Sequence, residues 1–273
     1  MKTIEKIIKP NKEKKTEQPP IVDLRKKTEN PFVYNYYRRS KVLLNFPIDR
    51  GRLFVFPLDI KNNPIIHAVH REVMSPGCGQ LRKYLEQYYE IFTPANIYEL
   101  FNLDFSKYHG YSDIPAWGMP LPWRDYNIEE WMKGIQRSIA LENKIEGNDI
   151  PIEYGFTWYG PVCKEKLVIE ENRYIKTLYS IREKGYDEKF GFIKVEIFVD
   201  NSGEWRWSCI NGLHRLACLV ALGYTIIPAQ ISGVIYRDEV DAWPNILNRV
   251  YTPECALEIF DKLFHTKIEY TVK

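Results

Sequence analysis

The ten residues CINGLHRLAC, from Cys209 to Cys218, mark the point where a strand is expected to turn directly into a helix. Trp205, Trp207 and Cys209 occupy every second position, which is the side-chain period of a strand. Apolar residues then recur at helical spacing at positions 213, 216, 217, 220 and 221, and Gly223 is a stop signal. The stretch therefore predicts a strand–turn–helix unit.

The segments on either side of this unit extend it into an α+β fold. Helical spacing of apolar residues predicts a helix over residues 170–184, and alternation predicts a strand over residues 193–199. Residues 200–203 have turn composition, so this strand and the next should form a hairpin. A strand over residues 225–232 follows, which Pro228 places at a sheet edge or a strand end, and Thr252-Pro253-Glu254 opens a last helix.

The N-terminal half is less regular and rich in aromatic residues. We expect a strand over residues 52–56, a helix over residues 80–92, a short helix capped by Thr93, and a helix over residues 128–143. Prolines and tryptophans between Pro115 and Trp123 predict an irregular loop that could form a lid over a polar cleft. We expect most other aromatic side chains to lie in the core.

Residues 1–30 are expected to form a disordered basic leader. Residues 1–31 hold nine Lys and Arg against five Asp and Glu, a balance of +4, so the rest of the chain carries −2 of the total of +2. Affinity for DNA comes mainly from Lys and Arg that neutralise phosphates, so nucleic acid is not the expected partner of this body. Contact of the leader with an anionic surface is the alternative.

Whole-chain features predict a globular protein of the cytoplasm. A content of 45% apolar and 27% charged residues excludes a wholly disordered chain. No run of apolar residues is long enough to span a membrane, and the first residues lack the apolar core of a signal peptide. The five scattered cysteines favour a reducing compartment over a disulfide framework. No P-loop, Rossmann or α/β-hydrolase motif is present.

The turn at residues 211–215 has the chemistry of an anion site. Backbone N–H groups at a helix start favour a negative charge, and Gly212 lets a ligand approach the backbone closely. Arg215 adds a guanidinium that can hold two phosphate oxygens, and His214 can bind a phosphate or transfer a proton near neutral pH. Asn211 and Leu213 complete the turn. These residues predict a site for a phosphorylated small molecule.

An ordered series of residues resembles the ParB/sulfiredoxin superfamily over about residues 161–233. The series is Glu170-Glu171-Asn172-Arg173, Gly185, the hairpin, the turn at residues 211–215, Gly223-Tyr224 and Ile227-Pro228. The resemblance implies a ParB/sulfiredoxin-like core over residues 156–273, with a small mixed sheet flanked by helices, after a helical and aromatic extension over residues 31–155. The chain looks most like stand-alone ParB-like proteins found with bacterial surface-polysaccharide genes.

The turn also separates this chain from the best-known branches. Chromosome-partitioning ParB proteins have Gly-Glu-Arg-Arg here, bind CTP and continue into a helix-turn-helix, and this chain has neither that turn sequence nor a helix-turn-helix pattern. Leu213 stands where sulfiredoxins have a catalytic cysteine, so their chemistry is excluded, and Cys209 and Cys218 are expected to be buried. The free serine kinase branch has Asp-Gly-x-His-Arg, and Asn211 replaces its acid here.

The resemblance implies Mg²⁺-dependent phosphoryl or group transfer from ATP or ADP to a small hydroxylated acceptor, with CTP as another nucleotide. The expected phosphate-binding residues are Asn211, Gly212, Leu213, His214, Arg215 and, across the cleft, Arg173. The catalytic candidates are Glu170, Glu171 and His214, with one acid as base or Mg²⁺ ligand at the helix start. The alternatives are a non-catalytic adaptor that senses CTP or ATP, and a ParB-like nuclease.

Other polar residues carry weaker expectations. We expect Lys164 and Lys166 to be solvated, although either could reach a substrate phosphate. His67 and His70 have helical spacing, but nothing nearby completes a metal site, so we expect no structural zinc site and no metal-binding residues. Cys78 should be an ordinary loop cysteine.

Overall fold

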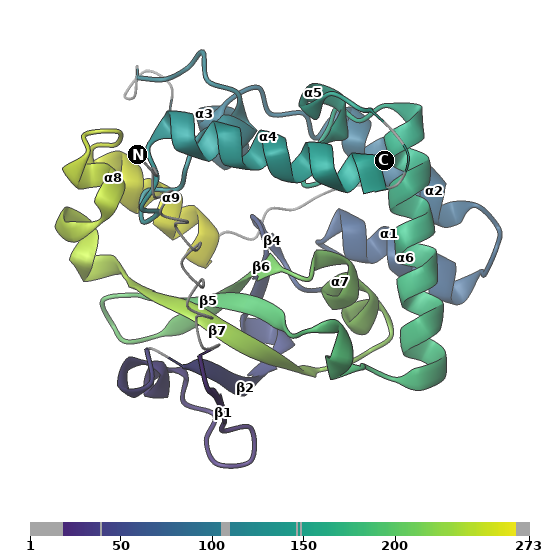
Figure 1. Cartoon of the computed structure of the whole chain (residues 1–273), viewed down its shortest axis with the longest axis horizontal. Helices are drawn as coiled ribbons and strands as arrows, with labels where there is room; N and C mark the ends of the chain where they lie inside the picture. Colours follow the sequence, from purple (N-terminus) through teal and green to yellow (C-terminus); the bar gives the residue numbers. More distant parts are fainter. Residues whose placement is uncertain (1–18, 39, 105–109, 146, 148, 266–273) are drawn as a thin grey trace, which may run out of the picture.

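A mixed sheet of seven strands, in the order β1-β2-β7-β5-β6-β3-β4, lies at the centre of the computed structural model (Figure 1). The structure describes residues 19–38, 40–104, 110–145, 147 and 149–265. The strands are β1 Ile21–Asp23, β2 Lys41–Pro47, β3 Gly51–Leu53, β4 Phe56–Pro57, β5 Ile193–Val199, β6 Trp205–Asn211 and β7 Ile226–Tyr236. The predicted α+β class is confirmed.

The helices include α1 Pro64–Met74, α2 Gln80–Ile91, α6 Lys164–Lys184 and α7 Leu213–Ala221, which pack against one another at one end of the sheet. The others are α3 Ile97–Phe101, α4 Ile128–Ile145, α5 Ile152–Gly155, α8 Pro244–Leu247 and α9 Pro253–His265. In Figure 1, α4 lies across the upper part of the view and α6 runs down one side. None of the described helices is long and apolar enough to cross a membrane.

The strand–turn–helix unit forms where the sequence predicts it. Strands β5 and β6 pair antiparallel, with Ile197 opposite Trp207, and helix α7 begins directly after β6. Asp200 closes the hairpin because its carboxylate accepts hydrogen bonds from the backbone N–H groups of Ser202 and Glu204, both at 2.9 Å. These local signals therefore fix the position of the residues that follow β6.

Strand β7 is a central strand, so the sheet-edge alternative for Pro228 is wrong. It pairs antiparallel with β2 on one side and parallel with β5 on the other. Pro228 lies opposite Asn45 of β2, but the pairing of β7 with β5 starts only at the next residue, Ala229. On the β5 side, Pro228 is therefore beyond the end of the paired segment. The strand-end alternative accounts for the missing N–H group.

The leader and the domain boundaries differ from the prediction. Residues 1–18 lie outside the described residues, but β1 (Ile21–Asp23) pairs in parallel with β2, so a disordered leader that reaches residue 30 is wrong. Strands β2, β3 and β4 come from the predicted helical extension over residues 31–155. They lie in the same sheet as the strands of residues 156–273, with β2 beside β7 and β3 beside β6.

Two N-terminal elements also depart from the sequence pattern. The predicted strand over residues 52–56 is interrupted because Phe54 adopts a φ of 58°, and the chain turns there between β3 and β4. The short helix α3 starts at Ile97 rather than after Thr93, because the side chain of Asn96 accepts hydrogen bonds from two first-turn N–H groups, each at 3.1 Å.

Aromatic residues fill the core, as expected. Trp207 is fully buried, lies 5.8 Å from Phe46 between ring centroids, and donates a hydrogen bond from Nε1 to the carbonyl of Pro47 at 2.8 Å. In the predicted lid loop, Trp123 packs 5.2 Å from Phe198 and 5.3 Å from Trp243. That loop does not line the cleft described below, so it is not a lid over that cleft.

Candidate functional site

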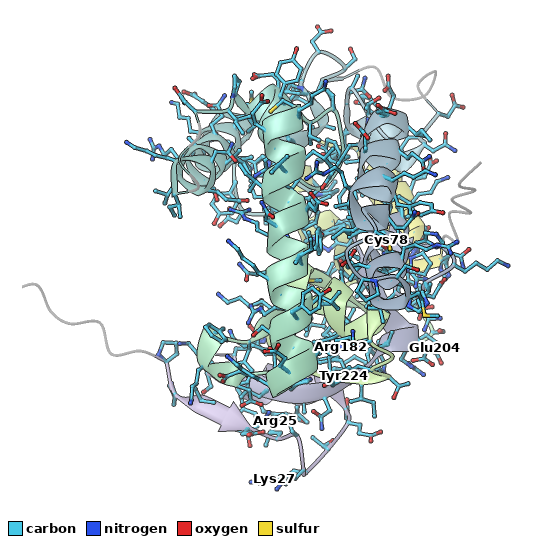
Figure 2. All side chains as sticks on the ribbon, turned by 90° about the vertical axis from the view of Figure 1, so that its right-hand side faces the viewer. Arg25, Lys27, Cys78, Arg182, Glu204 and Tyr224 are labelled. Atoms are coloured by element: carbon cyan, nitrogen blue, oxygen red, sulfur yellow. The ribbon has the colours of Figure 1, made fainter. Side chains whose placement is uncertain are left out.

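A cleft of about 740 Å³ opens beside the start of α7. One wall is the face of α6 that carries Arg173, Thr177 and Ser180, and the other is the face of α4 that carries Ile135 and Ile139. Segments at residues 156–158 and 185–190 close its two ends. Figure 2 faces α6 and shows α4 on one side of it and α1 and α2 on the other. The volume lies within the roughly 300–1,000 Å³ of small-molecule sites.

The predicted anion corner lies in this cleft. Gly212 precedes α7 with a φ of 96°, a left-handed conformation that favours glycine. No side chain of the described residues caps this helix, so the first N–H groups of α7 remain available to a ligand. Asn211, Leu213 and His214 also line the cleft. A negatively charged group would be stabilised here by the helix dipole.

Arg215 lines the same corner, and backbone carbonyls hold it. Its Nη1 donates to the carbonyl of Phe190 at 3.1 Å and to that of Gly191. These partners are neutral, so the positive charge of the guanidinium is not cancelled by them. Its Nη2 lies close to Gly212, 3.2 Å from the position that a Cβ atom there would occupy. Arg215 and the helix start therefore present positive charge to one corner.

His214 and Glu170 form a hydrogen-bonded pair at the floor of the cleft. Nε2 of His214 lies 2.6 Å from Oε2 of Glu170, and the ring packs 4.5 Å from that of Tyr174. Glu170 is fully buried, whereas the side chain of His214 is 24% exposed and lines the cleft. Burial acts to raise the pKa of Glu170, but the hydrogen bond and charge from His214, with Lys166 and Arg173, outweigh it and lower that pKa.

A buried cation supports Glu170 from behind. The Nζ of Lys166 lies 3.3 Å from Oε1 of Glu170, 3.2 Å from Oε1 of Glu142 and 2.8 Å from Oδ1 of Asn143. The expectation of a solvated lysine is wrong, since Lys166 is 0% exposed. Its three N–H donors have three acceptors, which is the arrangement that makes a buried ammonium tolerable.

Arg173 reaches the cleft but is already paired. Its Nη1 contacts Oε1 of Glu142 and lies 3.2 Å from Oε1 of Glu170. It therefore joins α4 to α6 and forms part of the wall, and a ligand would share it with two carboxylates. Arg173 was predicted to bind phosphate across the cleft from the turn at residues 211–215. Its position agrees with that prediction, because Arg173 and Arg215 line the same cleft.

Glu171 does not belong to the site. Helix α6 begins at Lys164, six residues before the predicted start, so neither Glu170 nor Glu171 lies at a helix terminus. The carboxylate of Glu171 instead bonds Arg82 of α2, with Nε at 2.6 Å, and it does not line the cleft. The predicted position at a helix start is therefore wrong, and the contacts of Glu171 give no support to a role as base or metal ligand in this cleft. Glu170 is fully buried and does not itself line the cleft, so it contacts the cleft through His214.

The two cysteines near the turn are buried, as predicted. Burial raises the pKa of Cys209 to about 12 and also raises that of Cys218. Neither is a nucleophile under ordinary conditions, which agrees with the exclusion of sulfiredoxin chemistry by Leu213.

Sequence reasoning missed the contributions of α4 and of residues 156–158. Ile135, Ser138, Ile139 and Glu142 recur at i, i+3, i+4 and i+7, so they lie on one face of α4. The spacing was visible, but nothing local shows that this face meets α6. Within the described residues, no group of three or more acidic, His or Cys side chains could hold a metal ion.

Comparisons with protein-family models, curated proteins and solved structures gave no match to this chain.

Proposed function

We propose that this protein binds a nucleotide, ATP or ADP with Mg²⁺ or else CTP, and transfers a phosphoryl group from it to a hydroxylated acceptor. The observation that carries the proposal is the His214–Glu170 pair beside the uncapped start of α7 in an open cleft. The residue series that resembles the ParB/sulfiredoxin superfamily supports the same function, including the expected link to surface-polysaccharide assembly.

The anion corner is suited to phosphate. Phosphoryl transfer is catalysed mainly by positioning and by stabilising charge on phosphate oxygens. The N–H groups at residues 213–215 and the guanidinium of Arg215 supply donors that cannot lose a proton near neutral pH. The carbonyls of Phe190 and Gly191 fix the guanidinium before a ligand arrives, so little side-chain entropy is lost on binding.

His214 is suited to act as the general base. The ionised carboxylate of Glu170 accepts a hydrogen bond from Nε2, which leaves Nδ1 as the basic nitrogen. Nδ1 has no hydrogen-bond partner among the described residues. It would take the proton of the acceptor hydroxyl as the acceptor oxygen bonds to phosphorus and the bond from phosphorus to the rest of the nucleotide breaks.

Mg²⁺ fits this cleft only together with phosphate. Of the two acids that line the cleft, Glu142 is already paired with Lys166 and Arg173, so Asp187 is the better placed to join waters and phosphate oxygens around Mg²⁺. When bound, the metal ion would neutralise phosphate charge.

Calorimetry tests the binding step. Pyrophosphate, ATP, ADP and CTP are titrated with Mg²⁺ into wild type, R215A and R182A; Arg182 is exposed near the end of α6 and labelled in Figure 2. Loss of the Arg215 contacts, worth about 1.5–3 kcal/mol each, should weaken binding at least about tenfold, and R182A should match wild type. If none of the four ligands binds wild type, the proposal is wrong.

An adaptor is the second candidate, because α4 exposes apolar residues that do not line the cleft. Leu141 is 62% exposed and Ile145 is 74% exposed. A ligand that contacts α4 could change how a partner meets this surface. Binding without turnover over a panel of alcohols would favour the adaptor, and turnover would establish the enzyme.

A further inference from the structure

The cleft has a second end whose lining differs from the anion corner. Away from α7 its lining residues include Ile135 and Ile139 of α4 and the aromatic residues Phe156 and Trp158. Such a surface does not bind phosphate, because apolar side chains offer it no hydrogen-bond donor. This end therefore needs a different part of the ligand, or a second ligand.

The aromatic end is held in place by the core. The ring of Trp158 packs edge-on against Phe54, with centroids 5.4 Å apart. The carbonyl of Trp158 accepts a hydrogen bond from the hydroxyl of Tyr88, and that of Thr157 accepts one from Tyr89 at 3.0 Å. Both tyrosines belong to the buried face of α2. The indole is therefore positioned before any ligand binds, which lowers the entropic cost of stacking.

The His214–Glu170 pair lies between the two ends. From the anion corner, contacts run from His214 to Glu170, from Glu170 to Arg173, and from Arg173 to Glu142 of α4. Glu142 shares its helix face with Ile135 and Ile139. A hydroxyl that gives its proton to His214 while phosphate occupies the corner would have its carbon body on the apolar side.

We propose that the acceptor is a ring-bearing alcohol, whose apolar ring face lies between Trp158 and the Ile135 face of α4. The inference rests on the proposed function and refines its acceptor. An open-chain alcohol the size of serine would leave this apolar end filled with water. The short polar side chains of Ser138 and Thr177, which also line the cleft, can hold further hydroxyls of the ring.

Saturation-transfer NMR tests this without nucleotide or turnover. The probes are two matched pairs, methyl β-glucoside against sorbitol, and tyrosinamide against serinamide. In at least one pair the ring compound should bind wild type about fivefold more tightly than its open-chain partner, the effect expected for one aromatic contact. Equal affinities in both pairs, or no binding of either ring compound, would overturn the inference.

Variants locate the binding. W158A and I135S should weaken ring binding about fivefold, and W158F should restore most of it. L141S, at an exposed position of α4 that does not line the cleft, is the control and should match wild type. Circular dichroism checks that each variant folds. Ring affinities unchanged in folded W158A and I135S would also overturn the inference.

Pyrophosphate binding separates this inference from the proposed function. If wild type binds pyrophosphate through Arg215 but shows no preference for rings, only the acceptor assignment fails. If pyrophosphate does not bind at all, the proposed function fails first.

Discussion

Glu170 and Glu171 are neighbours in α6, but their carboxylates meet partners on different sides of the helix. Glu170 bonds His214 at 2.6 Å on the cleft side, and Glu171 bonds Arg82 of α2. A turn of about 100° per residue separates adjacent side chains on a helix, so two consecutive acids can serve different purposes. This divergence gives a matched pair of variants.

E170Q should lower turnover about 10²- to 10⁴-fold, the usual contribution of a positioned general base, because an amide cannot stabilise the protonated ring of His214. E171Q should keep the wild-type rate per folded molecule. Steady-state kinetics with both proteins, corrected for the folded fraction, is the measurement. Equal losses in both variants would contradict the assignment of Glu170.

The pH dependence of stability should differ in sign between two buried acids. The pKa of Glu170 is lowered from 4.5, so its contribution is present above pH 4.5 and is lost as the pH falls through its folded pKa. Burial raises the pKa of Glu196 despite the ion pair with Arg124, at 2.6 Å. Its contribution is present below pH 4.5 and is lost as the pH rises through its folded pKa.

Urea unfolding of wild type, E170Q and E196Q between about pH 3 and pH 6 checks these signs. The stability advantage of wild type over E170Q should shrink toward acid pH, and that over E196Q should grow. If both stability differences changed in the same direction with pH, the opposite pKa shifts of Glu170 and Glu196 would be contradicted.

Lys166 should matter for stability far more than its neighbour on the helix. K166M removes the buried one of the two cations that Glu142 and Glu170 share, Lys166 and Arg173, and breaking a buried pair costs about 3–5 kcal/mol. K164M alters an exposed side chain and should change the free energy of unfolding by less than about 0.5 kcal/mol. Denaturant midpoints measure both, and a K166M protein as stable as wild type would refute the buried network.

Substitution of Gly212 by alanine should have two effects, backbone strain and a steric contact, and substitution of Gly203 should have only the first. Both have positive φ, so alanine at either position should cost about 1–3 kcal/mol in backbone strain. A Cβ atom at residue 212 would lie 3.0 Å from Cγ1 of Ile193 and 3.2 Å from Nη2 of Arg215, whereas nothing lies within 4 Å at residue 203. G212A should therefore also lose pyrophosphate affinity in calorimetry, and G203A should retain it.

Thiol labelling should report the burial of the cysteines. Cys78 is exposed and labelled in Figure 2, so an aromatic disulfide reagent should modify it in the native protein. Burial raises the pKa of Cys209 and that of Cys255 to about 12, so both should react only after unfolding. C78S should remove the fast phase of the native reaction, and a fast phase that survives would place another thiol at the surface.

Local chemistry accounts for what the sequence predicted well. The β5–β6 hairpin and the start of α7 follow from alternation, from turn residues and from Gly212, all within twenty residues. The start of α6 was missed because Cys163 provides no side-chain cap, so no local signal marks it. The roles of Glu171 and Lys166 depend on partners in α2 and α4, which lie far away in sequence and are brought close only by tertiary packing.

The placement of β2 beside β7 and of β3 beside β6 has a consequence for any attempt to shorten this protein. A chain that started at residue 156 would keep the His214–Glu170 pair but would uncover the backbone N–H and C=O groups of β7 and β6 on both flanks. Such open flanks invite intermolecular strand pairing. We therefore expect residues 156–273 alone to aggregate more readily than the full chain.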